Sequence, residues 1–319
     1  MVAHDQRGVL LAPTAVGAMP SPVVVIGDAL LDVHVTPSSA VRPGADIAAA
    51  VRLEPGGQGA NLAVRLARRG VPVRLTCALG DDIAGTMLRY ALAADGVDLR
   101  PIRVLASGMV VVLLGAGGER TMLSQRVPLV RRLEATFADG APWLIISGYL
   151  LLEPDASQLA RFATVQKRRA VVGCALEPAQ AEAWTAVLRA MRPSLLVING
   201  DEASVLASHV ADARTLAGRL ARDLDAVVVV TEPSGAFAAV GDRVTRVDAP
   251  EGEPATDTTG AGDAFAAALI AELLTDPWPP AEEPLERALA AASRLASAVA
   301  RTAGAQGRVA GEPPATLGA

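Results

Sequence analysis

Lysine is almost absent from this chain of 319 residues. Lys167 is the only one, and it stands in a polar Gln-Lys-Arg-Arg run. This excludes a Gly-Lys-Ser/Thr phosphate loop and leaves no lysine in the setting of a Schiff base or a protein kinase. Any phosphate chemistry in this chain must therefore rely on backbone amides, arginine and a metal ion.

Cysteine and histidine are scarce as well. Cys77 and Cys174 are the two cysteines, and each lies in an apolar, strand-like run. This pattern predicts buried thiols in a reduced cytoplasm. The three histidines are scattered, so we expect no zinc site.

Excess positive charge and long apolar runs are missing too. The net charge is −5 and the pI is near 5.4, which argues against nucleic acid as a partner. No apolar run is long and clean enough to span a membrane. Residues 9–19 resemble a weak signal core, but they contain Pro and Gly and lead into a core-type strand. We expect residues 1–22 to be a flexible leader and the protein to be cytoplasmic.

What the chain does have is 51% hydrophobic residues, enough for one large α/β domain with a small appendage. From Trp143 onward strands and helices alternate: strand Leu144–Ser147, helix Ala156–Arg168, strand Ala170–Cys174, helix Ala179–Met191 and strand Leu195–Ile198. This order predicts a largely parallel, doubly wound sheet with helices on both faces. Residues 33–55 and 101–125 interrupt it with antiparallel strands that could cover a cleft. We therefore expect a domain over residues 23–310 and a frayed tail over 311–319.

One stretch late in the chain carries the strongest chemical signal. Asp257-Thr258-Thr259-Gly260-Ala261-Gly262-Asp263 precedes the apolar run Ala264–Leu274, which is typical of a buried helix. Two glycines at a helix start allow backbone N–H groups to approach an anion. We expect the helix dipole to keep Asp263 ionised, as a base beside that anion site. This arrangement suits phosphoryl transfer to a hydroxyl, although a bare Gly-Ala-Gly would more simply be a helix cap.

Polar residues follow other predicted strands. Asp28 and Asp32 come after the strand Val23–Ile26, where they either meet a ligand or form Asx turns. Glycines with Asn61 open the helix Leu62–Arg69, and Asn199 with Glu202 opens another, where helix capping is the simpler role.

The late stretch closely resembles the C-terminal signature of the ribokinase-like (pfkB-type) carbohydrate kinases, and Gly56-Gly57-Gln58-Gly59-Ala60-Asn61 resembles their first signature. The resemblance covers about residues 23–309. It implies a three-layer α/β/α fold with a small β lid. Gln58 stands where ribokinases usually have Lys, and Leu30 where they usually have Asn, which argues against ribose in particular. Loss of that positive charge favours a neutral sugar over a sugar phosphate.

The resemblance also implies a role for each matching residue. Asp263 would be the catalytic base, with Gly260, Ala261 and Gly262 as the anion hole. The substrate would be bound by Asp32, Gly56, Gly57, Gln58 and Asn61. The nucleotide would be bound by Asn199, Thr231, Gly235, Thr259, Gly260 and Gly262, with Glu202 ordering water around Mg²⁺ and Asp257 near a monovalent-cation site. The cofactors implied are ATP and Mg²⁺, with K⁺ as a candidate activator.

Several alternatives stay open. A nucleoside could replace the sugar, because the family includes nucleoside kinases. A catalytically silent sugar-binding relative is a second alternative, and a nicotinamide-dependent oxidoreductase is a third, although Phe265 breaks its glycine fingerprint. Arg103, Arg120, Arg126 and Tyr149 are further candidates for substrate contact. Exposed lid edges could pair two copies into a homodimer or be capped within one chain.

Overall fold

The computed structural model describes residues 21–115, 120–134, 138, 140–162, 167–207, 212–252 and 254–313. Most of the predicted leader, residues 1–20, and residues 314–319 of the predicted tail lie outside the described residues.

A nine-stranded sheet forms the centre of the body, in the order β13-β12-β11-β10-β9-β8-β1-β4-β5. The strands pair in parallel except at one edge, where β12 pairs antiparallel with both β11 and β13. Runs of β-branched residues supply the central strands, which are buried on both faces, whereas the edge strands β5 and β13 are partly exposed. In chain order, the nine strands are β1 Val23–Ile26, β4 Val73–Gly80, β5 Asp98–Val104, β8 Leu144–Ser147, β9 Arg169–Val172, β10 Leu195–Asn199, β11 Val227–Glu232, β12 Gly235–Val240 and β13 Arg243–Asp248.

Helices cover both faces of this sheet, and each face has its own core. Val23 and Val25 of β1 point into one core, and Val24 and Ile26 point into the other. The first core is covered by α1 Gln58–Arg68, α2 Ile83–Ala94, α7 Ala261–Glu272 and α8 Glu282–Val299. The second is covered by α4 Ala181–Met191, α5 Gly200–Ala207, α6 Ala213–Leu224 and the 3₁₀ turns Val130–Arg132, Gly148–Leu152 and Ala156–Arg161. The expected three-layer α/β/α architecture is confirmed.

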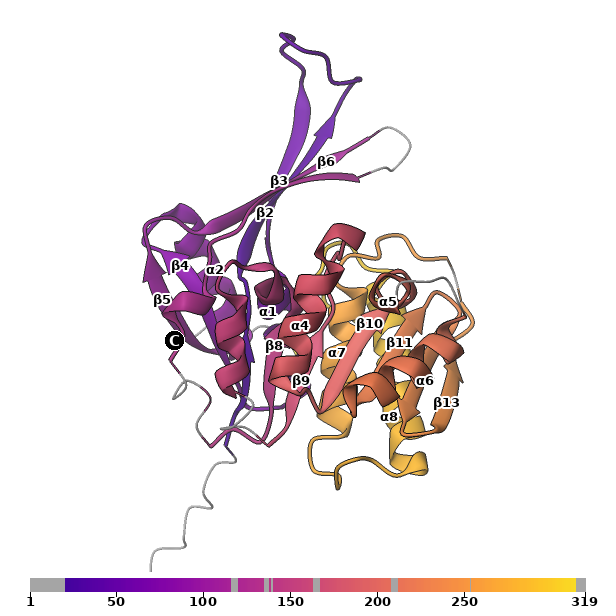
Figure 1. The fold of residues 1–319 in the computed structure, drawn as a ribbon. Helices are drawn as coiled ribbons and strands as arrows, with labels where there is room; N and C mark the ends of the chain where they lie inside the picture. Colours follow the sequence, from indigo (N-terminus) through magenta and orange to yellow (C-terminus); the bar gives the residue numbers. More distant parts are fainter. Residues whose placement is uncertain are drawn as a thin grey trace, which may run out of the picture.

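A second, four-stranded sheet forms the lid and projects away from the body (Figure 1). It consists of β2 Leu30–Pro37, β3 Ala49–Gly56, β6 Gly108–Leu114 and β7 Arg120–Gln125, in the order β3-β2-β6-β7. The expected lid is present with two differences. Residues 98–104 form β5 beside β4 in the main sheet, so the second lid insertion begins at Gly108 rather than at 101. In addition, β2 and β6 pair in parallel, so the lid sheet is mixed.

Two local expectations also change. Ala156–Arg161 is a 3₁₀ turn rather than the start of a long helix, and residues 163–166 of that predicted helix lie outside the described residues. The segment after 311 is anchored where it is described, because the Glu312 side chain is only 7% exposed and pairs with Arg65. Among the described helices, none has the length and apolarity that crossing a bilayer requires.

The topology explains where a ligand would bind. The chain passes from β1 to β4 and β5 on one side, then returns to β8 on the other side of β1. In open α/β sheets, ligands bind at the carboxyl ends of strands near such a reversal. Asp28, Ser147, Gly173, Asn199 and Thr231 all lie at or just past these strand ends.

Candidate active site

The cleft above the strand ends contains two adjoining cavities. The first, which we call the polar compartment, has a volume of about 390 Å³ and is lined by Asp32, Asn61, Glu202 and Asp263 among others. The second, the apolar compartment, has a volume of about 440 Å³ and is lined largely by Ala, Pro and Phe265. Thr231, Thr258 and Gly262 line both, so the start of α7 lies where the two meet.

Helix α7 begins at a turn that contains two glycines, and close packing requires glycine at one of them. Gly260 is the N-cap residue, with a φ of 75°, and a Cβ there would lie 2.8 Å from the backbone of Ala305. A Cβ on Gly262, in contrast, would meet nothing within 4 Å, because this residue faces the cleft. The first N–H groups of a helix have no intrahelical acceptor, so this turn presents donors to an anion in the cleft.

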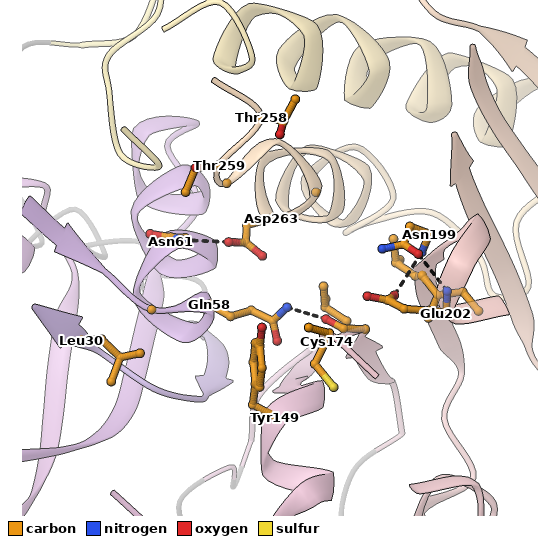
Figure 2. Close-up of a pocket in the computed structure, with 18 of the residues that line it drawn as sticks. Leu30, Gln58, Asn61, Tyr149, Cys174, Asn199, Glu202, Thr258, Thr259 and Asp263 are labelled. Carbon is orange, nitrogen blue, oxygen red and sulfur yellow. Dashed lines mark hydrogen bonds between the residues drawn. The ribbon is translucent and has the colours of Figure 1, made fainter. Parts of the chain in front are cut away.

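Asp263 lies in the first turn of α7 and points toward the centre of the site (Figure 2). Asn61 Nδ2 on α1 donates a hydrogen bond to Asp263 Oδ2 over 2.8 Å, and the Gln58 side chain is a second partner. Burial, the largest cause, and the Asp28 carboxylate raise the pKa of Asp263 to about 6, while hydrogen bonds from Asn61 and Gln58 and the charge of Arg65 oppose the shift. The pKa is therefore raised, against the lowering expected from the helix dipole. At pH 7 the carboxyl still ionises, with a basicity that suits proton abstraction.

Gln58 occupies the wall of the polar compartment, but its amide is taken up by the protein. Its Nε2 donates to the Gly173 carbonyl over 2.6 Å, and its Oε1 accepts from Ser147 Oγ at 2.6 Å and from the Gly148 N–H at 3.0 Å. The residue thus ties the start of α1 to the ends of β8 and β9. A substrate contact by Gln58, as the signature implies, would have to compete with these three bonds.

Asp32 lies in the lid strand β2 and is only 8% exposed. Burial raises its pKa to about 7, helped by the Asp28 and Glu54 carboxylates and opposed by Arg126. Gly56 backs this side chain, since a Cβ at Gly56 would lie 2.2 Å from Asp32 Oδ2. Gly56 is therefore behind the carboxylate rather than in the cavity wall, whereas Gly57 lines the cavity.

Arg126 is the cation among the residues that line the polar compartment. Its guanidinium pairs with Asp28 and stacks 3.6 Å from the centroid of the Tyr149 ring. Both residues were open candidates, and both line the cavity. Arg103 does not, because its side chain is 81% exposed and pairs with Asp81. The signal for Arg126 was weak, since an arginine after a strand is usually a surface residue.

Asn199 and Glu202 bond to each other at the end of β10. Asn199 Oδ1 accepts from the Glu202 N–H at 2.9 Å, and Glu202 Oε2 accepts from the Asn199 N–H at 3.1 Å. Both side chains still line the polar compartment, so the capping role and a ligand role coexist. Burial raises the pKa of Glu202 to about 7, opposed by the hydrogen bond from the Asn199 backbone.

This pair fits Mg²⁺ better than a transition metal. The described part of the chain contains no group of three or more His, Cys, Asp or Glu side chains that could hold a metal. Mg²⁺ retains several waters and binds through one or two carboxylates together with phosphate oxygens. A single half-buried glutamate beside an asparagine amide is such a donor set.

The remaining predicted residues lie along the apolar compartment and the start of α7. Thr231 and Gly235 line the apolar compartment, and Thr259 lines the polar one. Asp257 is engaged by the protein: its Oδ1 accepts from Arg120 and from the Thr259 N–H, both at 2.9 Å, and its Oδ2 accepts from the Gly304 N–H at 3.1 Å. Burial raises the pKa of Asp257, but these bonds outweigh it, so that its pKa is lowered.

Comparison with known proteins agrees with this geometry. A family model described as "pfkB family carbohydrate kinase" matches residues 21–310. A fructokinase of Salmonella typhimurium is 30% identical over 280 residues, covering 82% of this chain and 87% of that protein. An aminoimidazole riboside kinase of Salmonella typhimurium is 29% identical over 245 residues, covering 68% and 72%. The crystal structure of a Cryptococcus neoformans ribokinase in complex with ADP has a TM-score of 0.72 at 22% identity and covers 90% and 96%.

The chain therefore belongs to the pfkB family of carbohydrate kinases. It is a phosphotransferase with an alcohol group as acceptor, on the ribokinase-like fold.

Proposed function

We propose that this protein transfers the γ-phosphoryl group of ATP to a hydroxyl of a neutral sugar. One observation carries the proposal. The start of α7 lies between the two compartments, with Gly262 lining both of them and Asp263 in the polar one. A hydroxyl in the polar compartment and a phosphate chain arriving from the apolar one would meet at this point.

The acceptor would be held by Asp32, Asn61 and the backbone at Gly57, which line the same cavity. A neutral acceptor is favoured by charge. Arg126, the cation of that lining, is already paired with Asp28 and stacked on Tyr149. A phosphate or carboxylate on the substrate would have to displace that pair and face the carboxyl groups of Asp32 and Asp263.

Asp263 would accept the proton of the reacting hydroxyl, for which its pKa near 6 leaves it ionised at neutral pH. The amides of Gly260, Ala261 and Gly262 would stabilise negative charge on the phosphoryl group in transfer. Thr231, Gly235 and Thr259 would contact the nucleotide, and Asn199 with Glu202 would hold water around Mg²⁺. When bound, Mg²⁺ would neutralise part of the negative charge of the ATP phosphates. Because ATP is the donor, a cytoplasmic location is part of the proposal.

A nucleoside is the second candidate acceptor. Leu30, Val110 and Met122 from the lid line the polar compartment together with Tyr149 and give it an apolar side suited to a base. The aminoimidazole riboside kinase relative supports the same class.

The implied K⁺ site has less support. Because Arg120 already compensates the charge of Asp257, we propose that K⁺ activates this chain weakly. A rate in potassium buffer only slightly above that in tetramethylammonium buffer would agree with this, and a rate that depends strongly on potassium would contradict it.

We also propose a homodimer through the lid. The outer lid strands β3 and β7 expose Val51, Leu53, Met122 and Leu123, each by more than 45%. Light scattering would measure the mass in solution, and Val51→Lys should lower it to that of one chain. A wild-type protein of 32.6 kDa in solution would contradict the proposal.

The main test is an assay of ADP release with ATP·Mg²⁺ and a panel of sugars, sugar phosphates and nucleosides, with Asp263→Ala as control. We expect release with a neutral sugar and none in the variant. Release with a nucleoside alone would select the second candidate. A panel without any turnover, in a protein that still binds ATP, would favour a catalytically silent relative and overturn the proposal.

A further inference from the structure

The segment that follows α8 contacts the candidate site through a residue that lines neither compartment. Gln306 Nε2 donates a hydrogen bond to Asn61 Oδ1 over 3.0 Å, although the two residues are 245 positions apart. Asn61 in turn donates to Asp263. Gln306 is not among the residues that line either compartment, and its side chain reaches the site through the hydrogen bond to Asn61.

The direction of these bonds follows from the groups involved. A side-chain amide has one acceptor oxygen and one NH₂ donor, and an ionised carboxylate only accepts. Asp263 therefore requires the NH₂ group of Asn61, and Asn61 Oδ1 must then face a donor. Gln306 supplies that donor. Without it, a rotated Asn61 would direct its oxygen at the carboxylate, or the amide would swing into the cavity.

The backbone around Gln306 is held by the same helix that carries Asn61. Arg65 is one turn further along α1 and fully buried, and its NH2 group donates to the carbonyls of Ala305 (2.8 Å) and Gly307 (2.9 Å). Arg68 NH1 donates to the carbonyl of Gln306 itself over 2.8 Å. Asn61, Arg65 and Arg68 lie on one face of α1, because residues three and four apart are neighbours on a helix.

Buried carboxylates balance the charge of these arginines. Arg65 and Arg68 both pair with Glu312, and Arg68 also forms a bidentate pair with Asp95. Removing one partner of such a buried pair would leave an uncompensated charge, so the segment is held firmly against α1. Gln306 therefore presents its donor from a fixed backbone.

We propose that Gln306 is a positioning residue for the reaction: it fixes the amide of Asn61, which in turn holds the Asp263 carboxylate in place. This inference rests on the proposed role of Asp263 as the base. The charged groups that influence Asp263 are Arg65 from α1, Asp28 after β1 and Glu202 from α5. None of them is changed by substitution of Gln306.

The test compares Gln306→Leu, which keeps the size but removes the hydrogen bond, with Gln306→Glu, which at neutral pH can only accept. In Gln306→Leu we expect kcat to fall by about threefold to tenfold, the usual effect of one lost hydrogen bond, with KM for ATP unchanged because neither Gln306 nor Asn61 lines the apolar compartment. Because the Asn61 bond lowers the pKa of Asp263, the acid limb of the kcat/KM profile should move to higher pH. Gln306→Glu should lose more activity, since its carboxylate faces the Asn61 oxygen.

Arg308→Gln is the matched control for loosening of the segment. Arg308 pairs with Asp95 and is 32% exposed, and it makes no bond to Asn61 or Asp263. We expect its kcat and pH profile to match the wild type. The same loss in this variant as in Gln306→Leu would mean that general loosening is the cause, and would overturn the inference.

A double-mutant cycle separates this inference from the proposed function. If Gln306 acts through Asn61, Gln306→Leu should cost nothing further in an Asn61→Leu background. Additive losses, or an unchanged kcat and pH profile in Gln306→Leu, would overturn the inference alone. Turnover retained by Asp263→Asn would instead overturn the proposed function, whatever the Gln306 variants do. Thermal unfolding of each variant checks that it is folded.

Discussion

The two compartments of the cleft are built differently. In the polar compartment, side chains that face the cavity also bond to each other: Asn61 to Asp263, Asn199 to Glu202, and Gln58 to the ends of β8 and β9. The apolar compartment is walled mainly by small or apolar residues such as Ala255, Ala296 and Phe265. A bonded wall specifies donors and acceptors at fixed points, whereas an apolar wall specifies only shape.

The two walls therefore differ in what a substitution changes. Pro233 lies beside the apolar compartment, among residues that contribute mainly size and apolar surface. Gln58 departs from the first signature in the polar compartment, where its amide bonds to Ser147, Gly148 and Gly173. Substitutions in the polar compartment should therefore change kcat or the acceptor KM, whereas substitutions in the apolar compartment should change the KM for ATP.

The largest effect should come from Asp263→Asn. It removes the proposed base but keeps the size of the side chain, so kcat should fall by about 10²–10⁴-fold. ATP binding, measured by calorimetry, should change little, because Asp263 does not line the apolar compartment. Loss of ATP binding in a folded variant would break the separation between the compartments.

Gly262→Ala tests the junction of the compartments. Its methyl group would meet no protein atom within 4 Å, so the variant should fold normally, with up to about 1 kcal/mol of added stability in the helix. The same methyl would occupy the space beside the helix amides, and kcat should fall by about 10²–10³-fold.

Gly260→Ala is the matched contrast. Its φ of 75° and the 2.8 Å approach of Ala305 predict a loss of stability of about 1 kcal/mol or more. Unfolding curves and activity for the pair are the measurement. Full activity in Gly262→Ala would contradict the amide site.

Asp32→Asn should change the KM of the acceptor but not that of ATP. It should also show how much the buried Asp32 carboxyl destabilises the ligand-free protein. Loss of a charged hydrogen-bond partner predicts a rise in acceptor KM of about 10- to 100-fold, with KM for ATP unchanged. The pKa of Asp32 is raised from 3.8 to about 7 in the folded protein. Between these two pH values the Asp32 carboxyl is ionised in the unfolded chain but protonated in the folded protein. Its contribution to the free energy of unfolding therefore falls as the pH rises to about 7 and is then constant.

The substitution should therefore stabilise the ligand-free protein by at least about 1 kcal/mol more at pH 8 than at pH 5. Denaturant unfolding at the two pH values measures this difference. Asp242→Asn is the control, because that side chain is 95% exposed. An equal gain at both pH values would show that Asp32 is not a buried, ionising carboxyl.

The smallest effect on activity should come from Ala296→Leu on α8. The larger side chain would fill part of the apolar compartment and raise KM for ATP by about tenfold, or about 1.4 kcal/mol. KM for the acceptor and the pH profile should stay as in the wild type. A change in acceptor KM of similar size would mean that the two compartments do not act separately.

The sequence by itself determined the architecture and indicated the main elements of the candidate site. Runs such as Val23–Ile26 form buried parallel strands because β-branched residues suit them wherever they occur. The helix after Asp257–Gly262 follows from a local signature and an apolar run. Signals of this kind depend on neighbours along the chain, so a single sequence contains them.

Only the tertiary structure decided which of these residues act together. Asn61 and Asp263 are 202 positions apart, and Gln306 reaches Asn61 across 245. The pKa values near 6 and 7 at Asp263 and Asp32 come from burial, against the expectation from the helix dipole alone. Residues 98–104 pair with β4 in the main sheet rather than with the lid strands. No local sequence pattern predicts which of the two sheets they join. Hydrogen bonds between distant side chains and desolvation depend on what the folded chain brings next to a group, and a linear pattern does not record it.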